Sequence, residues 1–158
     1  MTASLRDLRW WDVGELVGLE LLLFHGDAWS AETWWGELAQ AQNRWYTGVV
    51  LSTCPDRIAG YAGASVSGPD ADVMTVAVAP WAQGRGVGGQ LMGALVDAVA
   101  ERGASTLVLE VRADNVAAQR LYTRYGFERI AVRRGYYQGV DAWIMRLRPL
   151  RSIDSLAP

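Results

Sequence analysis

The feature that most constrains the fold of this chain is a strand-like segment that runs directly into a glycine-rich helix start. The segment reads Val76-Ala77-Val78-Ala79-Pro80-Trp81-Ala82-Gln83-Gly84-Arg85-Gly86-Val87-Gly88-Gly89. Glycines at a helix start let backbone N–H groups approach a phosphate closely, and the helix dipole favours negative charge there. The chain contains no Lys, so the segment is not a P-loop, and a Rossmann loop would follow the first strand. The segment is therefore either another kind of phosphate-binding loop or a tight turn with positive φ.

Length and composition favour one globular domain. The chain has 158 residues, of which 51% are hydrophobic and 20% charged, which is enough for one core and too few for two. We predict a single domain over residues 1–158, with a frayed tail at 151–158. The single Cys54 excludes an internal disulfide, no Cys/His spacing suits a structural zinc, and Glu20 interrupts the longest apolar stretch. We therefore expect a cytoplasmic protein with no bound metal and no membrane association.

Hydrophobic periodicity predicts a chain that mixes strands and helices. Strands are expected at Leu5–Arg9, Arg44–Leu51, Arg57–Val66, Asp72–Ala79, Ser105–Arg112, Phe127–Val132 and Asp141–Leu147. Helices are expected over 13–24, after an N-cap at Ser30, from the glycine loop to a terminal Gly103, and after a cap at Asp114 or Asn115. This order predicts the α/β class, with a mixed, mostly antiparallel sheet and helices on both of its faces.

A second motif lies downstream of the glycine loop. Gln83-x-x-Gly86-x-Gly88 and the later Asn115-x-x-Ala118-x-x-Leu121-Tyr122-x-x-x-Gly126-Phe127 together resemble two signatures of the GNAT family of N-acetyltransferases. Trp29-Ser30, Leu109–Arg112 and Arg133–Tyr137 extend the resemblance, over roughly residues 4–148, to the RimI-like subgroup of N-terminal protein acetyltransferases. Two departures are Ala79, where Asp often precedes the Pro, and Gly135, where Asn or another polar residue is expected.

The resemblance implies the GNAT fold, with a splayed central parallel strand pair and acetyl-CoA bound in the V between the fourth and fifth strands. The residues implied to bind the pantetheine and the pyrophosphate are Val76, Ala77, Val78, Gln83, Gly84, Arg85, Gly86, Val87, Gly88 and Gly89. Asn115 and Tyr122 are implied to contact the same donor. Arg85 would pair with a phosphate or remain a solvated surface residue, and Asn115 would also cap its helix.

Amine acetylation requires a proton acceptor, because only a neutral amine attacks the thioester. Glu110 is our candidate, since a carboxylate inside an apolar strand is costly unless it is solvated or used. The alternative is a surface residue or an ion-pair partner of Arg112 or Arg133. Tyr122 matches the family position of the general acid that returns a proton to the CoA thiolate, and its alternative role is aromatic core packing.

Three aromatic residues are candidates for the acceptor site. By the resemblance, Tyr136 and Tyr137 hold the substrate backbone, although a plain hairpin pair of aromatic residues would look the same. Trp29 would line the acceptor site. His25 and Cys54 have no partner at catalytic or ligand spacing, and we assign them no role.

Charge is divided unevenly along the chain. Residues 1–79 contain four Arg and ten acidic residues, whereas residues 80–158 contain eleven Arg and seven acidic residues. The division favours an anionic ligand on the C-terminal half and a cationic one on the N-terminal half, although solvated charges would give the same totals. Because the formal net charge is only −2, we expect no direct binding of duplex nucleic acid.

The resemblance therefore implies acetyl transfer from acetyl-CoA to the N-terminal alanine of small-subunit ribosomal protein eighteen. The basic N-terminal segment of that protein would suit the acidic half of this chain, which we expect to be a monomer or weak oligomer. Two alternatives remain. One is a GNAT enzyme acting on a small-molecule amine or an aminoacyl-tRNA, the latter favouring a broad positive surface. The other is a non-catalytic acyl-CoA-binding regulator, expected to lack Glu110 or Tyr122.

Overall fold

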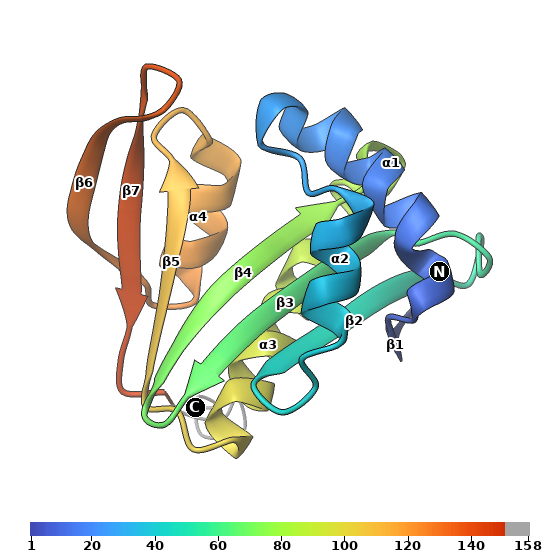
Figure 1. Ribbon diagram of the computed structural model, residues 1–158, viewed down its shortest axis with the longest axis horizontal. Helices are drawn as coiled ribbons and strands as arrows, with labels where there is room; N and C mark the ends of the chain where they lie inside the picture. The colour runs from blue at the N-terminus through green and yellow to red at the C-terminus, as the bar shows by residue number, and fades with distance from the viewer. Residues whose placement is uncertain (151–158) are drawn as a thin grey trace. The chain divides into compact units, whose positions relative to one another are not determined.

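Seven strands form one mixed sheet in the computed structural model, which describes residues 1–150 (Figure 1). They are β1 (Ala3–Asp7), β2 (Arg44–Leu51), β3 (Gly60–Ser67), β4 (Asp70–Val78), β5 (Thr106–Arg112), β6 (Glu128–Tyr137) and β7 (Val140–Leu147). Their order in the sheet is β1-β2-β3-β4-β5-β7-β6. β4 and β5 pair in parallel at the beginnings of both strands, whereas β1 with β2, β5 with β7 and β6 with β7 pair antiparallel. The predicted fold class is confirmed.

The helices lie where the periodicity predicted them. They are α1 (Val13–Phe24), α2 (Ala31–Leu38), α3 (Val87–Glu101) and α4 (Val116–Arg124). Ser30 caps α2 as predicted, because its Oγ accepts the Thr33 N–H at 3.2 Å. Gly103 follows α3 with a φ of +91°, as a C-terminal glycine does.

Several strand limits differ from the predictions. β1 begins and ends two residues earlier than predicted, since Arg9 already serves as N-cap of the 3-10 turn Trp10–Asp12. β3 begins at Gly60, not Arg57, because the N–H groups of the preceding residues bond outside the ladder, Arg57 to the Cys54 carbonyl and Ile58 to Glu15. β6 continues past Val132 to Tyr137 through an irregularity in its pairing with β7.

The chain divides into two compact units. The N-terminal unit comprises Met1–Gly63 and Thr75–Leu91, and the C-terminal unit comprises Ala64–Met74 and the chain from Met92 onward. The single-domain organisation over residues 1–158 stays a prediction, and the tail predicted at 151–158 lies outside the described residues. Within residues 1–150, no helix combines the length and the apolar character needed to cross a bilayer.

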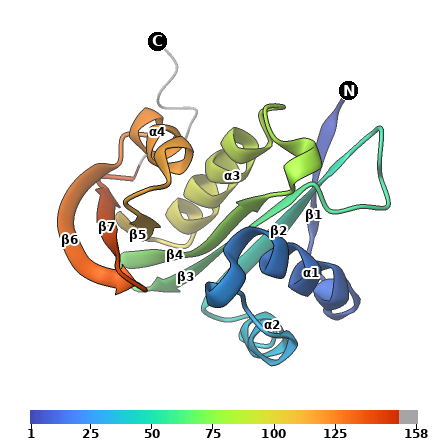
Figure 2. The ribbon, with the colours of Figure 1, turned by 90° about the horizontal axis from the view of Figure 1, so that it is seen from above.

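The N-terminal unit has its core between α1, α2 and the strands. Its buried members are Leu8, Val13, Leu16, Trp34, Ile58, Tyr61 and Ala77. In this unit α1 and α2 lie on one face of the strands and the first turns of α3 on the other (Figure 2). Burial of these large side chains is the main source of stability for such a unit, at about 1.5–3 kcal/mol for each.

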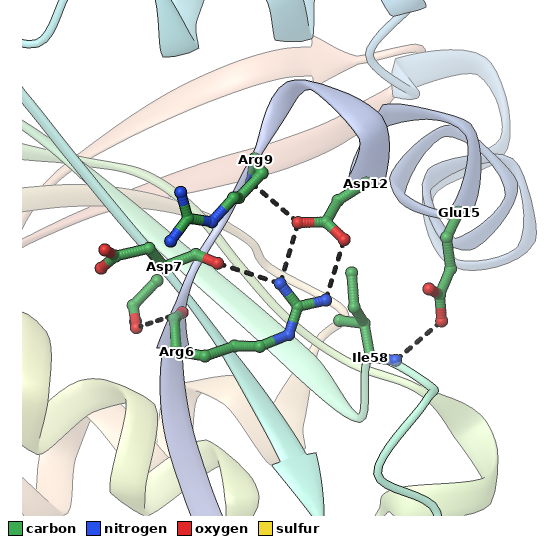
Figure 3. Close-up of polar contacts among 7 residues, drawn as sticks. Arg6, Asp7, Arg9, Asp12, Glu15 and Ile58 are labelled. Carbon is green, nitrogen blue, oxygen red and sulfur yellow. Dashed lines mark hydrogen bonds and ion pairs between the residues drawn. The ribbon is translucent and has the colours of Figure 1, made fainter.

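Ionic contacts fasten the start of the chain to this unit (Figure 3). The Arg6 guanidinium donates to both carboxylate oxygens of Asp12, at 2.8 and 2.9 Å, and the Arg9 N–H donates to Asp12 at 2.7 Å. Burial alone would raise the pKa of Asp12, but these donors hold it below its usual value. Glu15 accepts the Ile58 N–H at 2.7 Å, which ties α1 to the segment before β3.

In the C-terminal unit, β5 separates an apolar face from a polar one. Leu107, Leu109 and Val111 are buried, whereas Glu110 points to the opposite face and is exposed. Val111 pairs with Trp143 of β7, and Glu110 pairs with Ile144. The alternation that the sequence predicted for this strand is confirmed.

Candidate active site

The glycine-rich segment forms the end of β4, a 3-10 turn at Pro80–Ala82 and an exposed loop before α3. The Gln83 side chain donates to the Val78 carbonyl at 3.4 Å, so the loop is linked to the strand that precedes it. Gly84 and Gly86 have φ values of +74° and +78°, which other residues rarely adopt. An added Cβ would meet no atom within 4 Å at either glycine, so it is the backbone conformation that requires glycine.

The same loop delivers the chain to the N-terminus of a fifteen-residue helix. The first N–H groups of a helix lack acceptors within the helix and carry the positive end of its dipole. Gln83, Gly84, Arg85 and Gly86 are exposed, whereas Val87 is buried beneath them and anchors the helix start. The structure confirms the alternative of a tight turn, because Gly84 and Gly86 adopt positive φ, and binding of a phosphate at this loop stays a prediction.

Val76, Ala77 and Val78 form the last residues of β4, as the sequence predicted. Ala77 is buried in the core of the N-terminal unit, and its neighbours are half-buried. Arg85 is exposed, and its guanidinium contacts the Met1 sulfur at 3.5 Å. Among the described residues Arg85 has no carboxylate partner, so its guanidinium can pair with an incoming phosphate.

Glu110 projects from the polar face of β5 and pairs with Arg133 of β6. The Arg133 Nη1 lies 3.2 Å from Glu110 Oε1, reaching across the small, buried Ala142 of β7. The Glu110 side chain remains 32% exposed. This ion pair is the alternative to a catalytic role that the sequence left open for Glu110. The partial exposure of the carboxylate keeps it accessible to water.

Two tyrosines extend the polar cluster from Glu110. The Arg133 guanidinium lies 5.1 Å from the Tyr136 ring centre, and the Arg112 guanidinium lies 5.5 Å from the Tyr137 ring centre. The two rings meet edge to face with centroids 5.0 Å apart. Arg112 is itself held by Asp114 through two hydrogen bonds of 3.0 and 3.1 Å. The structure thus brings Glu110, Tyr136 and Tyr137 into one cluster.

Tyr122 lies on α4 and is 7% exposed. Burial, together with the nearby Tyr137, raises the pKa of Tyr122 to about 12. Its ring packs on Phe127 with centroids 5.8 Å apart, so the predicted packing role is present. Within residues 1–150 no group hydrogen-bonds to its hydroxyl, which is therefore a protonated donor at neutral pH.

Two backbone features hold the elements that carry these side chains. Asn115 is the N-cap of α4, because its Oδ1 accepts the Ala118 N–H at 3.1 Å. Gly135 has a φ of +64°, and its N–H donates to Asp141 Oδ1 at 2.9 Å. Asn and Gly are the residues that adopt this conformation most readily. The sequence departure at Gly135 therefore preserves the backbone conformation that Asn would adopt.

The buried carboxylate of Glu20 orders the segment between α1 and α2, a role that its place in the sequence did not predict. Glu20 of α1 is 2% exposed and accepts the Trp29 N–H at 3.1 Å and the Tyr61 hydroxyl at 2.9 Å. Trp29 in turn packs against Trp34, with ring centroids 4.9 Å apart. The signal was available, because Glu20 occupies the apolar stripe of α1. Only the structure shows its two partners and its link to Trp29.

The remaining candidates stay outside this chemistry. His25 ends α1 with a φ of +44°, and Cys54 is a free thiol in a turn. In the part of the chain that the structure describes, no group of three or more His, Cys, Asp or Glu side chains is arranged to hold a metal ion.

The chain is similar to known acetyltransferases in both sequence and fold. The acetyltransferase (GNAT) family model matches residues 5–127. Over 127 residues the chain is 41% identical to the [ribosomal protein bS18]-alanine N-acetyltransferase of Salmonella typhimurium, covering 78% of this chain and 82% of that one. Over 142 residues it is 39% identical to the N-alpha-acetyltransferase RimI of Mycobacterium tuberculosis, covering 85% of each chain.

Two further comparisons concern length and fold. An uncharacterized protein of Mycobacterium leprae is 41% identical over 142 residues, which are 85% of this chain but 38% of that longer protein. The crystal structure of the ribosomal-protein-S18-alanine N-acetyltransferase from Escherichia coli superposes with a TM-score of 0.82 at 30% identity, covering 95% of this chain and 96% of that one.

The buried Glu20 leads to a prediction about pH. Burial raises the pKa of Glu20, so its ionisation opposes folding, and its contribution to stability is lost as pH rises through the folded-state pKa. Glu20→Gln keeps an oxygen that can accept from the Trp29 N–H, and its amide NH2 can donate to the Tyr61 oxygen, but it cannot ionise. The melting temperature of Glu20→Gln should therefore rise relative to that of the parent as the pH increases from about 4 to 8. Each kcal/mol of difference in the free energy of unfolding corresponds to about 2–4 °C. Exposed Glu32→Gln is the matched control, and a parallel pH dependence of parent and Glu20→Gln would contradict the assignment.

Proposed function

Because this chain belongs to the GNAT acetyltransferase family, we propose that it transfers an acetyl group from acetyl-CoA to the N-terminal alanine of ribosomal protein bS18. The observation that carries the proposal is the match to the Salmonella bS18-alanine N-acetyltransferase along four fifths of that enzyme. The supporting observation within the chain is the presence of both candidate groups for proton transfer, Glu110 and Tyr122, in one unit.

The donor is proposed to bind at the glycine loop. Its pyrophosphate would accept hydrogen bonds from the backbone at the α3 N-terminus, residues 83–89, with Arg85 adding charge. Its pantetheine arm would lie along Val76, Ala77 and Val78, and Asn115 would contact it from the start of α4. Each of these assignments follows the family motifs, and the positive φ values of Gly84 and Gly86 support the loop assignment.

We propose that the nitrogen of the acceptor gives up two protons during the reaction. Glu110 takes the first, directly or through a water, and releases it to solvent after the neutral amine has attacked the thioester carbonyl. The second must leave when the tetrahedral intermediate collapses, as the C–S bond breaks and an amide forms. Tyr122 would pass a proton to the departing sulfur and recover one from the nitrogen, so the products are the acetylated chain and CoA thiol.

The high pKa of Tyr122 shapes this second step. The pKa of a free thiol is about 8.5, well below the value of about 12 that burial gives Tyr122. Complete loss of the tyrosine proton to a thiolate would therefore be unfavourable, whereas a coupled exchange leaves the hydroxyl protonated throughout. Trp29, Tyr136 and Tyr137 are proposed to hold the first residues of the acceptor, Trp29 from the segment before α2 and the tyrosines from the β6–β7 hairpin.

A peptide panel tests the proposed acceptor. An α-amine has a pKa of about 7.8 and a Lys amine about 10.4, so the neutral fraction of an α-amine at pH 7 is larger by a factor of several hundred, or about 3.5 kcal/mol. An Ala-initiated peptide with Arg shortly after it should lead the panel when CoA release is followed. Faster release from its N-terminally blocked, Lys-containing twin, from free amines or from aminoacyl-tRNA would refute the proposed acceptor.

The proton acceptor is tested by Glu110→Gln. This change removes the base with little change in shape, so turnover should fall by roughly 10²-fold or more at neutral pH, with partial recovery at high pH. Calorimetric binding of acetyl-CoA should be retained. Glu101→Gln is the matched control, since it also neutralises an exposed carboxylate of this unit but lies outside the cluster, and its turnover should stay within about threefold. Turnover of Glu110→Gln within that same range would leave Glu110 with a structural role only.

The proton donor is tested by Tyr122→Phe, which keeps the ring packing on Phe127 and removes only the hydroxyl. Since no described residue bonds to that hydroxyl, the melting temperature should be unchanged while turnover falls by about tenfold or more. Tyr125→Phe, at the C-cap of the same helix, is the control. Full activity, or inactivity explained by unfolding, would assign Tyr122 to the core.

A further inference from the structure

A groove in the C-terminal unit lies between α4 and β7, and the proposed reaction does not use it. Its volume is about 760 Å³, within the range of ligand sites. Its α4 wall includes Val116, Ala117, Arg120, Thr123 and Arg124, and Trp143 of β7 also lines it. It therefore combines an aromatic and aliphatic surface with guanidinium groups.

The groove is separate from the residues assigned to catalysis. At about 100° per residue, Arg120 and Arg124 lie on the side of α4 roughly opposite to Ala118 and Tyr122. Trp143 pairs with Val111, whereas Glu110 pairs with Ile144, so the Trp143 and Glu110 side chains are on opposite faces of the sheet. A ligand in the groove would therefore touch neither proposed proton-transfer group.

The groove concentrates positive charge. Arg120 and Arg124 are one helical turn apart, an arrangement of like charges that destabilises a helix by a few tenths of a kcal/mol. A third guanidinium, from Arg129 of β6, lies 4.7 Å from the centre of the Trp143 ring. No carboxylate is among the lining residues, and within residues 1–150 none of the three arginines forms an ion pair. An anion would therefore find unpaired guanidinium groups here.

Guanidinium groups beside aromatic and aliphatic side chains favour an anion that also carries an apolar surface. Guanidinium groups bind phosphates through two parallel hydrogen bonds, and the half-buried Trp143 indole that lines the groove can give a base a stacking surface. Inorganic phosphate would use the arginines but not Trp143, the valine or the alanine. A duplex would need a broad positive surface, which a chain with a net charge of −2 lacks. A flexible single strand can place phosphates at separate arginines and a base between them.

We propose that this groove binds a segment of single-stranded RNA, with its phosphates on Arg120, Arg124 and Arg129 and a base against Trp143. The site gives a role to three of the eleven arginines in residues 80–158 to which acetyl transfer assigns none. The choice of RNA over DNA rests on the proposed function, since an enzyme whose acceptor is a ribosomal protein meets its substrate close to RNA. The binding chemistry itself does not depend on that function.

The test measures binding of a fluorescein-labelled oligouridylate of about ten nucleotides to the full chain by anisotropy. Each phosphate contact on a single strand contributes about −0.7 to the slope of log affinity against log salt, so three contacts predict a slope of about −2. Arg120→Ala/Arg124→Ala should weaken binding at low salt by about tenfold or more and reduce the slope to about −0.7. Arg129→Ala, on a different element, should reduce the slope to about −1.4.

A matched control removes the same charge elsewhere. Arg57 lies 4.6 Å from the ring centre of Trp81, much as Arg129 lies on Trp143, and Arg102 is an exposed arginine of the turn after α3. Arg57→Ala/Arg102→Ala should bind the oligonucleotide within about twofold of the parent. Acetylation of the Ala-initiated peptide should be unchanged in the groove variants, because none of Arg120, Arg124 and Arg129 lies in the catalytic cluster. Melting temperatures should show that all variants are folded.

Four outcomes would overturn the inference. These are no saturable binding, an equal loss in the control and groove variants, displacement of the oligonucleotide by CoA, and tighter binding of a polyglutamate peptide or inorganic phosphate. Equal affinity for the matching DNA strand would overturn the assignment to RNA. A chain that binds the oligonucleotide through these arginines but acetylates no Ala-initiated peptide would refute the proposed acceptor and leave the RNA site standing, so the two failures are distinguishable.

Discussion

The alternation of side chains along β5 organises both functional surfaces of the C-terminal unit. Leu107, Leu109 and Val111 are buried on one face, and this burial holds the strand in register with β7. The same register sends Glu110 to the other face, where Arg133 pairs with it. A shift of one residue would exchange the faces, burying the carboxylate and exposing the leucines. The position of the proposed base is therefore a consequence of hydrophobic burial.

The arginines on the two sides of β5 differ in whether a carboxylate pairs with them. On the Glu110 face, Arg112 and Arg133 are neutralised by carboxylates and also lie against tyrosine rings. On the opposite face, Arg120, Arg124 and Arg129 have no carboxylate partner among residues 1–150. Paired guanidinium groups hold side chains in place, whereas unpaired ones attract anions. This contrast separates arginines that build the proposed acceptor cluster from those that line the groove.

In the N-terminal unit, buried carboxylates accept hydrogen bonds from backbone N–H groups and so hold those backbone segments in place. Asp12 accepts from Arg6 and from the Arg9 backbone, and Glu20 accepts from Tyr61 and from the Trp29 backbone (Figure 3 for Asp12). A buried carboxylate is tolerated only when such donors surround it. The opposite pKa shifts of the two groups follow from their partners, a guanidinium for Asp12 and only neutral donors for Glu20. Each fixes a segment that would otherwise be an irregular loop.

The sequence by itself determined the order of the elements, the glycine loop, the cap at Ser30, a cap at either Asp114 or Asn115, and the face on which Glu110 lies. These follow from local chemistry, since periodicity, capping and the conformational freedom of glycine act within a few residues. Only the tertiary structure decided that Glu110 meets Arg133, that Glu20 holds Trp29 and that Arg129 joins two arginines of α4 around Trp143. It also extended β6 to Tyr137, because pairing with β7 at Arg133 and again at Tyr137 sustains the strand across an irregular stretch where the local pattern predicts an end. Periodicity assigns a side chain to a face, and the packing of distant segments decides what that face meets.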